Sequence, residues 1–251
     1  MTFCPTISRR RLLQAGAAAA AAGFNGIGPS HAAAGNPVVV ELFTSQGCGS
    51  CPPADAFLAD LAKQPHVVAL GYHVDYWDYL GWKDTLGKPE FSQRQYDYAH
   101  ARGDMDVYTP QMIINGLDHL VGSDRARATS AIGRAAASGG IMPLTLSESD
   151  MELIVDIGAG NPKGETTLWV LPVVAAETVK ILKGEIAGQE IAYCNVVRAA
   201  IPAGMWSGEA KTVALPKESV MVDGSTGCVA LLQQGKVGPV VGLGQWGRTA
   251  G

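Results

Sequence analysis

The stretch that decides the fold is residues 38–63, VVVELFTSQGCGSCPPADAFLADLAK. Its first six residues form an apolar, β-branched run, which predicts a buried strand, and the polar, glycine-containing segment after them predicts a loop. From Cys51 onward apolar side chains recur at helical spacing, and the two prolines after Cys51 stand in the first turn, where a helix tolerates proline best. The pattern therefore places Cys48 and Cys51 at the start of a helix that follows a buried strand.

The segments after this stretch continue the alternation of strands and helices. Residues 67–74 predict a second strand, which runs parallel to the first because a helix connects them, and residues 89–102 predict a helix. Asn115-Gly116 lies between two short β-forming runs, which predicts a hairpin, and an alanine-rich helix follows it. We therefore expect an α/β thioredoxin-like domain over residues 35–140, with a central mixed sheet flanked by helices.

The pattern changes after residue 140. Short apolar runs alternate with turns that contain glycine and proline, up to Trp246, which is typical of an all-β structure. We expect a small all-β, sandwich-like domain over residues 141–251. Two modest domains also suit a chain of this length better than one.

The cysteine pair is the strongest chemical signal. Unpaired backbone N–H groups and the helix dipole favour a thiolate over a thiol at the start of a helix. We expect Cys48 to be an exposed nucleophile and Cys51 to resolve the mixed disulfide that Cys48 forms with a protein or with a small thiol or disulfide. This pattern predicts a thiol–disulfide oxidoreductase that needs no cofactor.

A predicted substrate groove lies beside the cysteines. Tyr108, Thr109 and Pro110 directly precede the hairpin strand, at the position where thioredoxin-like proteins hold a cis proline against the cysteine pair. The backbone of Thr109 would then pair with a bound chain by strand addition. Asp75 and Trp77 follow the second strand and either line this groove or pack a helical insertion against the sheet.

At these residues the chain resembles the secreted thioredoxin-like family known as domain of unknown function 1223. The likeness implies a thioredoxin-like domain with a β-rich extension, and it implies no activity, because that family has no settled one. One position departs from the pattern: Gly49 stands where serine is expected. The segments that carry the resemblance are ELFTSQGC (41–48), SCPPAD (50–55), YHVDYWD (72–78), YTPQ (108–111) and NVVR (195–198).

Several alternatives stay open. The cysteine pair also suits a structural disulfide, a non-catalytic binding module, or a copper-binding or copper-delivery protein that uses Cys48, Cys51 and His73, since Cu(I) prefers soft ligands. His73 ends the second predicted strand, beside the first, and so lies within reach of Cys48. Cys194 and Cys228 predict a structural disulfide in the β-rich half, with two buried free thiols as the alternative.

The N-terminus predicts export. Residues 1–34 place paired arginines before a mildly apolar, alanine-rich stretch and end in three alanines, which is typical of a twin-arginine signal cleaved near Ala34. We therefore expect a periplasmic or secreted protein without membrane insertion. Removal of the signal leaves 16 basic against 23 acidic residues, a net charge of about −7 that argues against nucleic acid as a partner.

Overall fold

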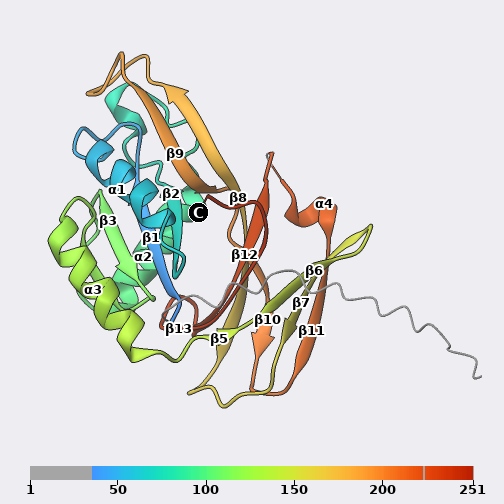
Figure 1. Cartoon of the computed structure of the whole chain (residues 1–251). Helices are drawn as coiled ribbons and strands as arrows, with labels where there is room; N and C mark the ends of the chain where they lie inside the picture. The colour runs from blue at the N-terminus through green and yellow to red at the C-terminus, as the bar shows by residue number, and fades with distance from the viewer. Residues whose placement is uncertain (1–35, 223, 251) are drawn as a thin grey trace, which may run out of the picture. The chain divides into compact units, whose positions relative to one another are not determined.

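A computed structural model describes residues 36–222 and 224–250 of the chain. The predicted signal over residues 1–34, with Cys4 and the cleavage site near Ala34, lies outside these residues. The described residues form one compact unit, whose strands and helices are drawn in Figure 1. No helix in the described part is both long and apolar enough to cross a membrane.

One ten-stranded mixed sheet dominates this unit (Figure 1). Its path is β4-β3-β1-β2-β9-β8-β12-β13-β5, and β10 pairs with β8 beside that path. The strands of this sheet are β1 (Val38–Thr44), β2 (Val67–His73), β3 (Gln111–Ile114), β4 (Asp118–Val121), β5 (Met142–Pro143), β8 (Thr166–Lys180), β9 (Glu190–Val197), β10 (Ile201–Trp206), β12 (Gly227–Gln234) and β13 (Val240–Gly247).

A three-stranded sheet and five helical segments complete the unit. The small sheet has the order β11-β7-β6. Its strands are β6 (Thr145–Glu148), β7 (Glu152–Ile157) and β11 (Lys211–Pro216). The helices are α1 (Pro52–Ala62), the 3₁₀ turn η1 (Asp78–Leu80), α2 (Pro89–Arg102), α3 (Arg125–Ser138) and α4 (Lys217–Val220).

Strand β1 is buried at all seven positions, because helices cover both of its faces. Val38, Val40 and Leu42 pack in one cluster with the apolar sides of α1 and α3. Val39 and Phe43 point the other way and pack with α2 and with strands β8 and β12. A strand covered on both faces reads as a continuous apolar run, which is the pattern seen in residues 38–43.

The predicted fold class is wrong. Strand β9 of the C-terminal half pairs with β2 in parallel, through Gly71 and Val196, so one sheet continues from the N-terminal half into the C-terminal half. The chain is mostly β and has few helices. It is not a thioredoxin-like α/β domain followed by a separate small sandwich. The outer edge of β2 pairs with β9, which lies more than 100 residues further along the chain, and no local sequence pattern predicts such a pairing.

The C-terminal half still forms two layers. The inner side of β7 packs against β8 and β12, so the three-stranded sheet covers one face of the large sheet. The boundary that the sequence predicts near residue 141 falls between α3 and β5.

A buried polar network also joins the two halves. Arg94 of α2 donates to Glu41 of β1 from Nε at 2.9 Å and from Nη2 at 2.7 Å, and to Gln233 of β12 at 2.6 Å. Tyr98 donates its hydroxyl to Glu41 and accepts from Gln233 at 2.8 Å. Burial raises the pKa of Tyr98, and the Glu41 carboxylate beside it adds to the effect. Burial acts to lower the pKa of Arg94, but Glu41 together with the Tyr98 and Tyr72 phenols raises it above its ordinary value, so the guanidinium stays charged.

Candidate functional site

Cys48 and Cys51 form a disulfide at the start of α1, as the sequence predicts. Their Cα atoms are 5.4 Å apart. The Cys48 carbonyl accepts from the Cys51 N–H at 3.2 Å, and the Cys51 carbonyl accepts from the first free N–H groups of α1, those of Ala54 and Asp55. The backbone of Cys51 is therefore fixed by the helix itself, and the backbone of Cys48 by a short turn before it.

The expected exposure of Cys48 is wrong for this disulfide form. The side chain of Cys48 is 2 % exposed and that of Cys51 is fully buried. The glycines on both sides of Cys48 are in close contact with other segments. A Cβ on Gly47 would lie 2.9 Å from Cβ of Trp77, and the Gly49 N–H donates to Glu185 Oε2 at 2.9 Å. Only Gly49 and Ser50 of this turn are exposed.

The predicted groove residues divide into two groups. The Thr109–Pro110 peptide is cis, and the β1–β3 register, which pairs Phe43 with Gln111, places Pro110 beside the end of β1. Trp77 Nε1 donates to Thr109 Oγ1 at 2.8 Å. Trp77 therefore contacts both the disulfide loop, at Gly47, and the segment before β3.

The other two predicted groove residues have partners elsewhere. The carboxylate of Asp75 accepts a hydrogen bond from the hydroxyl of Ser92 on α2 at 2.5 Å. The phenol of Tyr108 lies 3.5 Å from Nδ1 of His119 on β4, and its carbonyl accepts from Gln95. The described contacts thus bring Trp77 to the disulfide loop and link Thr109 to that loop through Trp77, whereas they engage Asp75 and Tyr108 with α2 and β4.

A buried acidic cluster behind the disulfide escaped the sequence analysis. Asp55 lies one helical turn after Cys51 and is 4 % exposed. Burial raises its pKa to about 7, although the nearby His73 acts in the opposite direction. A lone aspartate in the first turn of a helix usually indicates a surface residue near the helix dipole, so the sequence pattern gives no sign of its burial.

His73 and Asp84 extend this cluster. Nδ1 of His73 lies 2.9 Å from Asp84 Oδ2, and both side chains are buried. The same oxygen accepts from the Gln46 N–H at 2.8 Å, in the loop that leads to Cys48. Burial acts to raise the pKa of Asp84, but His73 and the backbone donors at Gln46 and Leu86 bring it below its ordinary value. The dyad therefore anchors the disulfide loop to the end of β2.

The same contacts bear on the copper alternative. His73 is 1 % exposed, its Nδ1 is taken by Asp84, and its ring meets that of Tyr193 edge-on at 4.5 Å. Within residues 36–222 and 224–250, no three His, Cys, Asp or Glu side chains are placed to hold a metal ion together. A copper site made by Cys48, Cys51 and His73 stays an untested prediction.

Comparison with known proteins identifies the family. The model of the family described as "Protein of unknown function (DUF1223)" matches residues 39–233. The chain belongs to this family. No curated protein matches it.

Two solved structures resemble this DUF1223 chain. A crystal structure of protein AGR_C_4864 from Agrobacterium tumefaciens is 39% identical, covers 84% of this chain and 94% of its own, and superposes with a TM-score of 0.73. HBP35 of Porphyromonas gingivalis is 14% identical over 85% of this chain and 75% of its own, with a TM-score of 0.58. At that identity the second likeness concerns the fold alone.

Cys194 and Cys228, the other two cysteines among the described residues of the DUF1223 chain, are free thiols, so the predicted Cys194–Cys228 disulfide is wrong. Cys194 lies on β9 and packs with the cluster under α1, whereas Cys228 lies on β12 in the cluster under the three-stranded sheet. Burial raises the pKa of each thiol to about 12. The alternative of two free thiols is the one that the structure supports.

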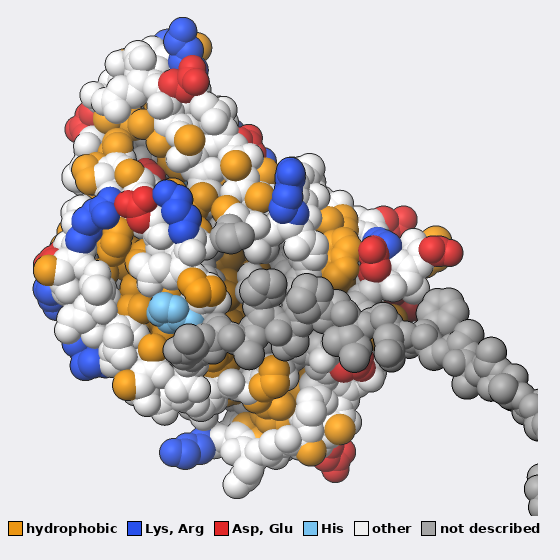
Figure 2. Space-filling view, viewed as in Figure 1, with side chains coloured by type: hydrophobic (Ala, Val, Ile, Leu, Met, Phe, Trp, Pro, Cys, Tyr) orange, Lys and Arg blue, Asp and Glu red, His pale blue; other side chains and the backbone are white. Residues whose placement is uncertain are grey.

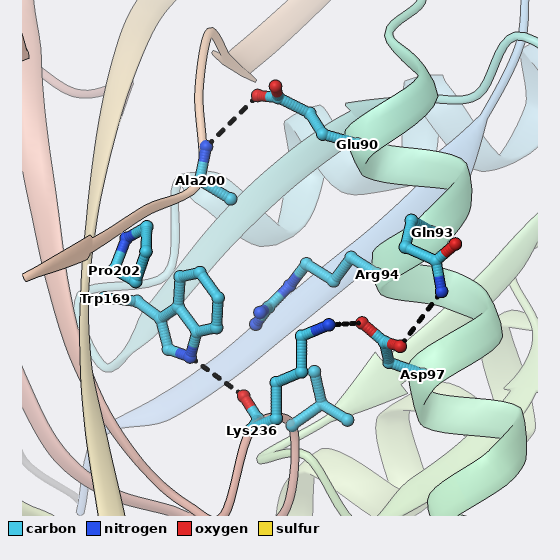
Figure 3. Close-up of a pocket in the computed structure, with 9 residues that line it drawn as sticks. Glu90, Gln93, Arg94, Asp97, Trp169, Ala200, Pro202 and Lys236 are labelled. Carbon is cyan, nitrogen blue, oxygen red and sulfur yellow. Dashed lines mark hydrogen bonds and ion pairs between the residues drawn. The ribbon is translucent and has the colours of Figure 1, made fainter. Parts of the chain in front are cut away.

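A pocket of the DUF1223 chain lies between α2 and the β-rich half, with a volume of about 240 Å³ (Figure 3). Arg94 points across it from α2 toward Trp169, whose ring centroid lies 5.4 Å from the guanidinium carbon. Glu41 already balances the charge of Arg94, so Arg94 adds no unpaired charge to the wall of this pocket. Its rim is closed by an ion pair between Lys236 and Asp97 at 2.6 Å.

Proposed function

We propose that this DUF1223 protein is a thiol–disulfide oxidoreductase in which Cys48 and Cys51 cycle between a disulfide and a dithiol. The observation that carries the proposal is the disulfide between residues three apart at the first turn of α1. Pro52 and Pro53 carry no N–H, so the support comes from the dipole of α1, whose positive end lies at the cysteine pair and favours a reactive thiolate over an inert thiol once the disulfide is reduced.

The reaction balances as a two-electron exchange. The Cys48 thiolate attacks a substrate disulfide, one substrate sulfur leaves as a thiolate, and a mixed disulfide forms. Cys51 loses its proton and attacks the Cys48 sulfur, so the Cys48–Cys51 disulfide forms and the second substrate sulfur leaves. The substrate is reduced and the protein is oxidised; the reverse sequence oxidises a substrate dithiol.

Asp55 is a buried carboxyl in the first turn of α1 that can take part in the proton transfer of this exchange. Its carboxyl lies one turn after Cys51, is screened from solvent, and has a pKa raised to about 7. A group that titrates near neutral pH is suited to accept the proton of a resolving thiol and to return it. We assign Asp55 that role within the proposed exchange.

A glutathione redox titration tests the function. The state of Cys48 and Cys51 is followed by alkylation and mass spectrometry, and a Cys194→Ala/Cys228→Ala variant serves as the matched control for the two other thiols. A reversible midpoint between about −120 and −270 mV is expected of an exchanging pair. A pair that stays oxidised below about −300 mV would be structural, and the proposal would be abandoned in favour of a binding module.

We also infer that the protein is exported and works in the periplasm or outside the cell. The support is the paired arginines and alanine-rich stretch of residues 1–34, together with a disulfide, which persists in oxidising compartments. Replacement of Arg9 and Arg10 by lysine should keep the precursor in the cytoplasm, as measured by cell fractionation. Undiminished export of that variant would remove the twin-arginine assignment.

A further inference from the structure

The tip of the β8–β9 hairpin reaches the disulfide loop. Residues 181–189 connect the two strands in a loop closed by its own backbone bonds, including Ile181 N–H to Gln189 and Gly188 N–H to Ile181. Ile181 and Ile186 are buried and fix the loop to the unit. In Figure 1 this tip lies beside the start of α1 and the η1 segment. The hairpin therefore covers the site with a defined structure.

Glu185 makes the direct contact. Its Oε2 accepts from the Gly49 N–H at 2.9 Å, and this N–H belongs to the peptide that joins Gly49 to Cys48. A Cβ on Gly49 would lie 2.5 Å from that same oxygen, so a side chain at residue 49 would force the carboxylate to shift from this position. The departure from serine at position 49 thus coincides with a carboxylate seated over it.

This carboxylate lies where a substrate must approach. Gly49 and Ser50 are the exposed residues of the turn, and Cys48 itself is 2 % exposed. Figure 2 shows acidic and basic side chains close together at the top of the view, over the hairpin tip, where Lys183 and Glu185 are both exposed. Of these two side chains, Glu185 is the one that accepts a hydrogen bond from the cysteine turn in the described contacts.

We propose that Glu185 is a specificity-determining residue that makes the Cys48–Cys51 pair exchange preferentially with disulfides carrying a positive charge beside the reacting sulfur. This inference rests on the proposed function. A cationic group next to the substrate sulfur is attracted to the Glu185 carboxylate as the sulfur reaches Cys48, whereas an anionic group is repelled. The predicted substrate class is a disulfide next to Lys, Arg or an amine.

Small disulfides of known charge test this directly. The pre-reduced full mature chain is mixed with cystamine, which is cationic, with dithiodipropionate, which is anionic, or with neutral hydroxyethyl disulfide. Formation of the Cys48–Cys51 disulfide is followed by acid quench, alkylation and mass spectrometry. The ratio of the cationic to the anionic rate constant is the readout, because any change in the ionised fraction of Cys48 affects both rates equally and cancels.

Three variants give the comparison. One unit charge at contact distance in water changes a rate roughly fivefold, so removal of the charge in Glu185→Gln slows the cationic disulfide and speeds the anionic one, and the ratio should fall by about 25-fold at low salt. Gly49→Ala should lower the ratio in the same direction, because the added Cβ displaces the carboxylate. Glu190→Gln removes the same charge from an exposed position on β9 and should leave the ratio within about twofold of the wild type.

The outcomes separate the two proposals. An unchanged ratio in Glu185→Gln, or a ratio that falls equally in Glu190→Gln, would overturn the role of Glu185 while leaving the exchange activity standing. A wild type that reacts with none of the three disulfides would overturn the proposed function and this inference together. Circular dichroism of each variant checks that the fold is intact.

Discussion

Asp55 makes the stability of this protein depend on pH in a direction opposite to that of most aspartates. Its carboxyl titrates near 3.8 when the chain is unfolded and at about 7 when it is folded, because burial disfavours the charged form. Between these pH values the folded state binds more protons than the unfolded state, so the free energy of unfolding falls as pH rises. The full effect, reached above about pH 7, is about 4 kcal/mol.

Asp55→Asn removes the charge and keeps the shape of the side chain. We expect this variant to gain about 3 kcal/mol relative to the wild type between about pH 4.5 and pH 8, measured by urea unfolding at both pH values. Asp60→Asn, on the exposed side of the same helix, is the matched control. The Arg125 and Lys63 side chains lower the pKa of Asp60, so its removal should change the pH dependence slightly and with the opposite sign. If the gap between Asp55→Asn and the wild type is the same at both pH values, the carboxyl does not titrate near neutral pH and its role as a proton acceptor falls with it.

Three further results are expected. Glu41→Gln leaves the buried charge of Arg94 unpaired and should lower the free energy of unfolding by about 3–5 kcal/mol in urea; a loss under about 1 kcal/mol would contradict the network. A fragment of residues 36–140 lacks β8, β9 and β12, so it should fail to give a single folded species by size exclusion and circular dichroism, whereas a stable monomer would restore the two-domain interpretation. Without reductant, two thiols of the full mature chain should react with a thiol reagent in denaturant. The same thiols should react slowly in the native protein, because burial raises the pKa of Cys194 and Cys228 to about 12. A count of zero reactive thiols in denaturant would mean that Cys194 and Cys228 pair after all.

The local features of the site were predictable, because each rests on neighbouring residues. The apolar run of residues 38–43, the prolines after Cys51 and the Thr109–Pro110 pair carry their own signals for a buried strand, a helix start and a cis peptide. Family membership followed from the same segments.

What failed depends on contacts between distant parts of the chain. Nothing around Gly71 or Val196 shows that their strands are neighbours, and the sequence proximity of Cys194 and Cys228 says nothing about their opposite placement in the sheet. The burial of Asp55 and the approach of Glu185 to Gly49 are likewise products of the assembled fold. The sequence therefore predicts the cysteine pair but not the side chains that surround it in the folded protein.

The pairing of β2 with β9 has a consequence for how this site can change in evolution. Because a sheet rather than a hinge carries the hairpin to the cysteines, the two halves cannot open like jaws around a substrate. Access to Cys48 depends on Trp77 beside Gly47 and on the nine residues of the 181–189 loop, whose ends are held in β8 and β9. Under the proposed exchange, insertions or substitutions in that loop would change which partner is chosen, while the cysteines, the helix and the core beneath them stay as they are.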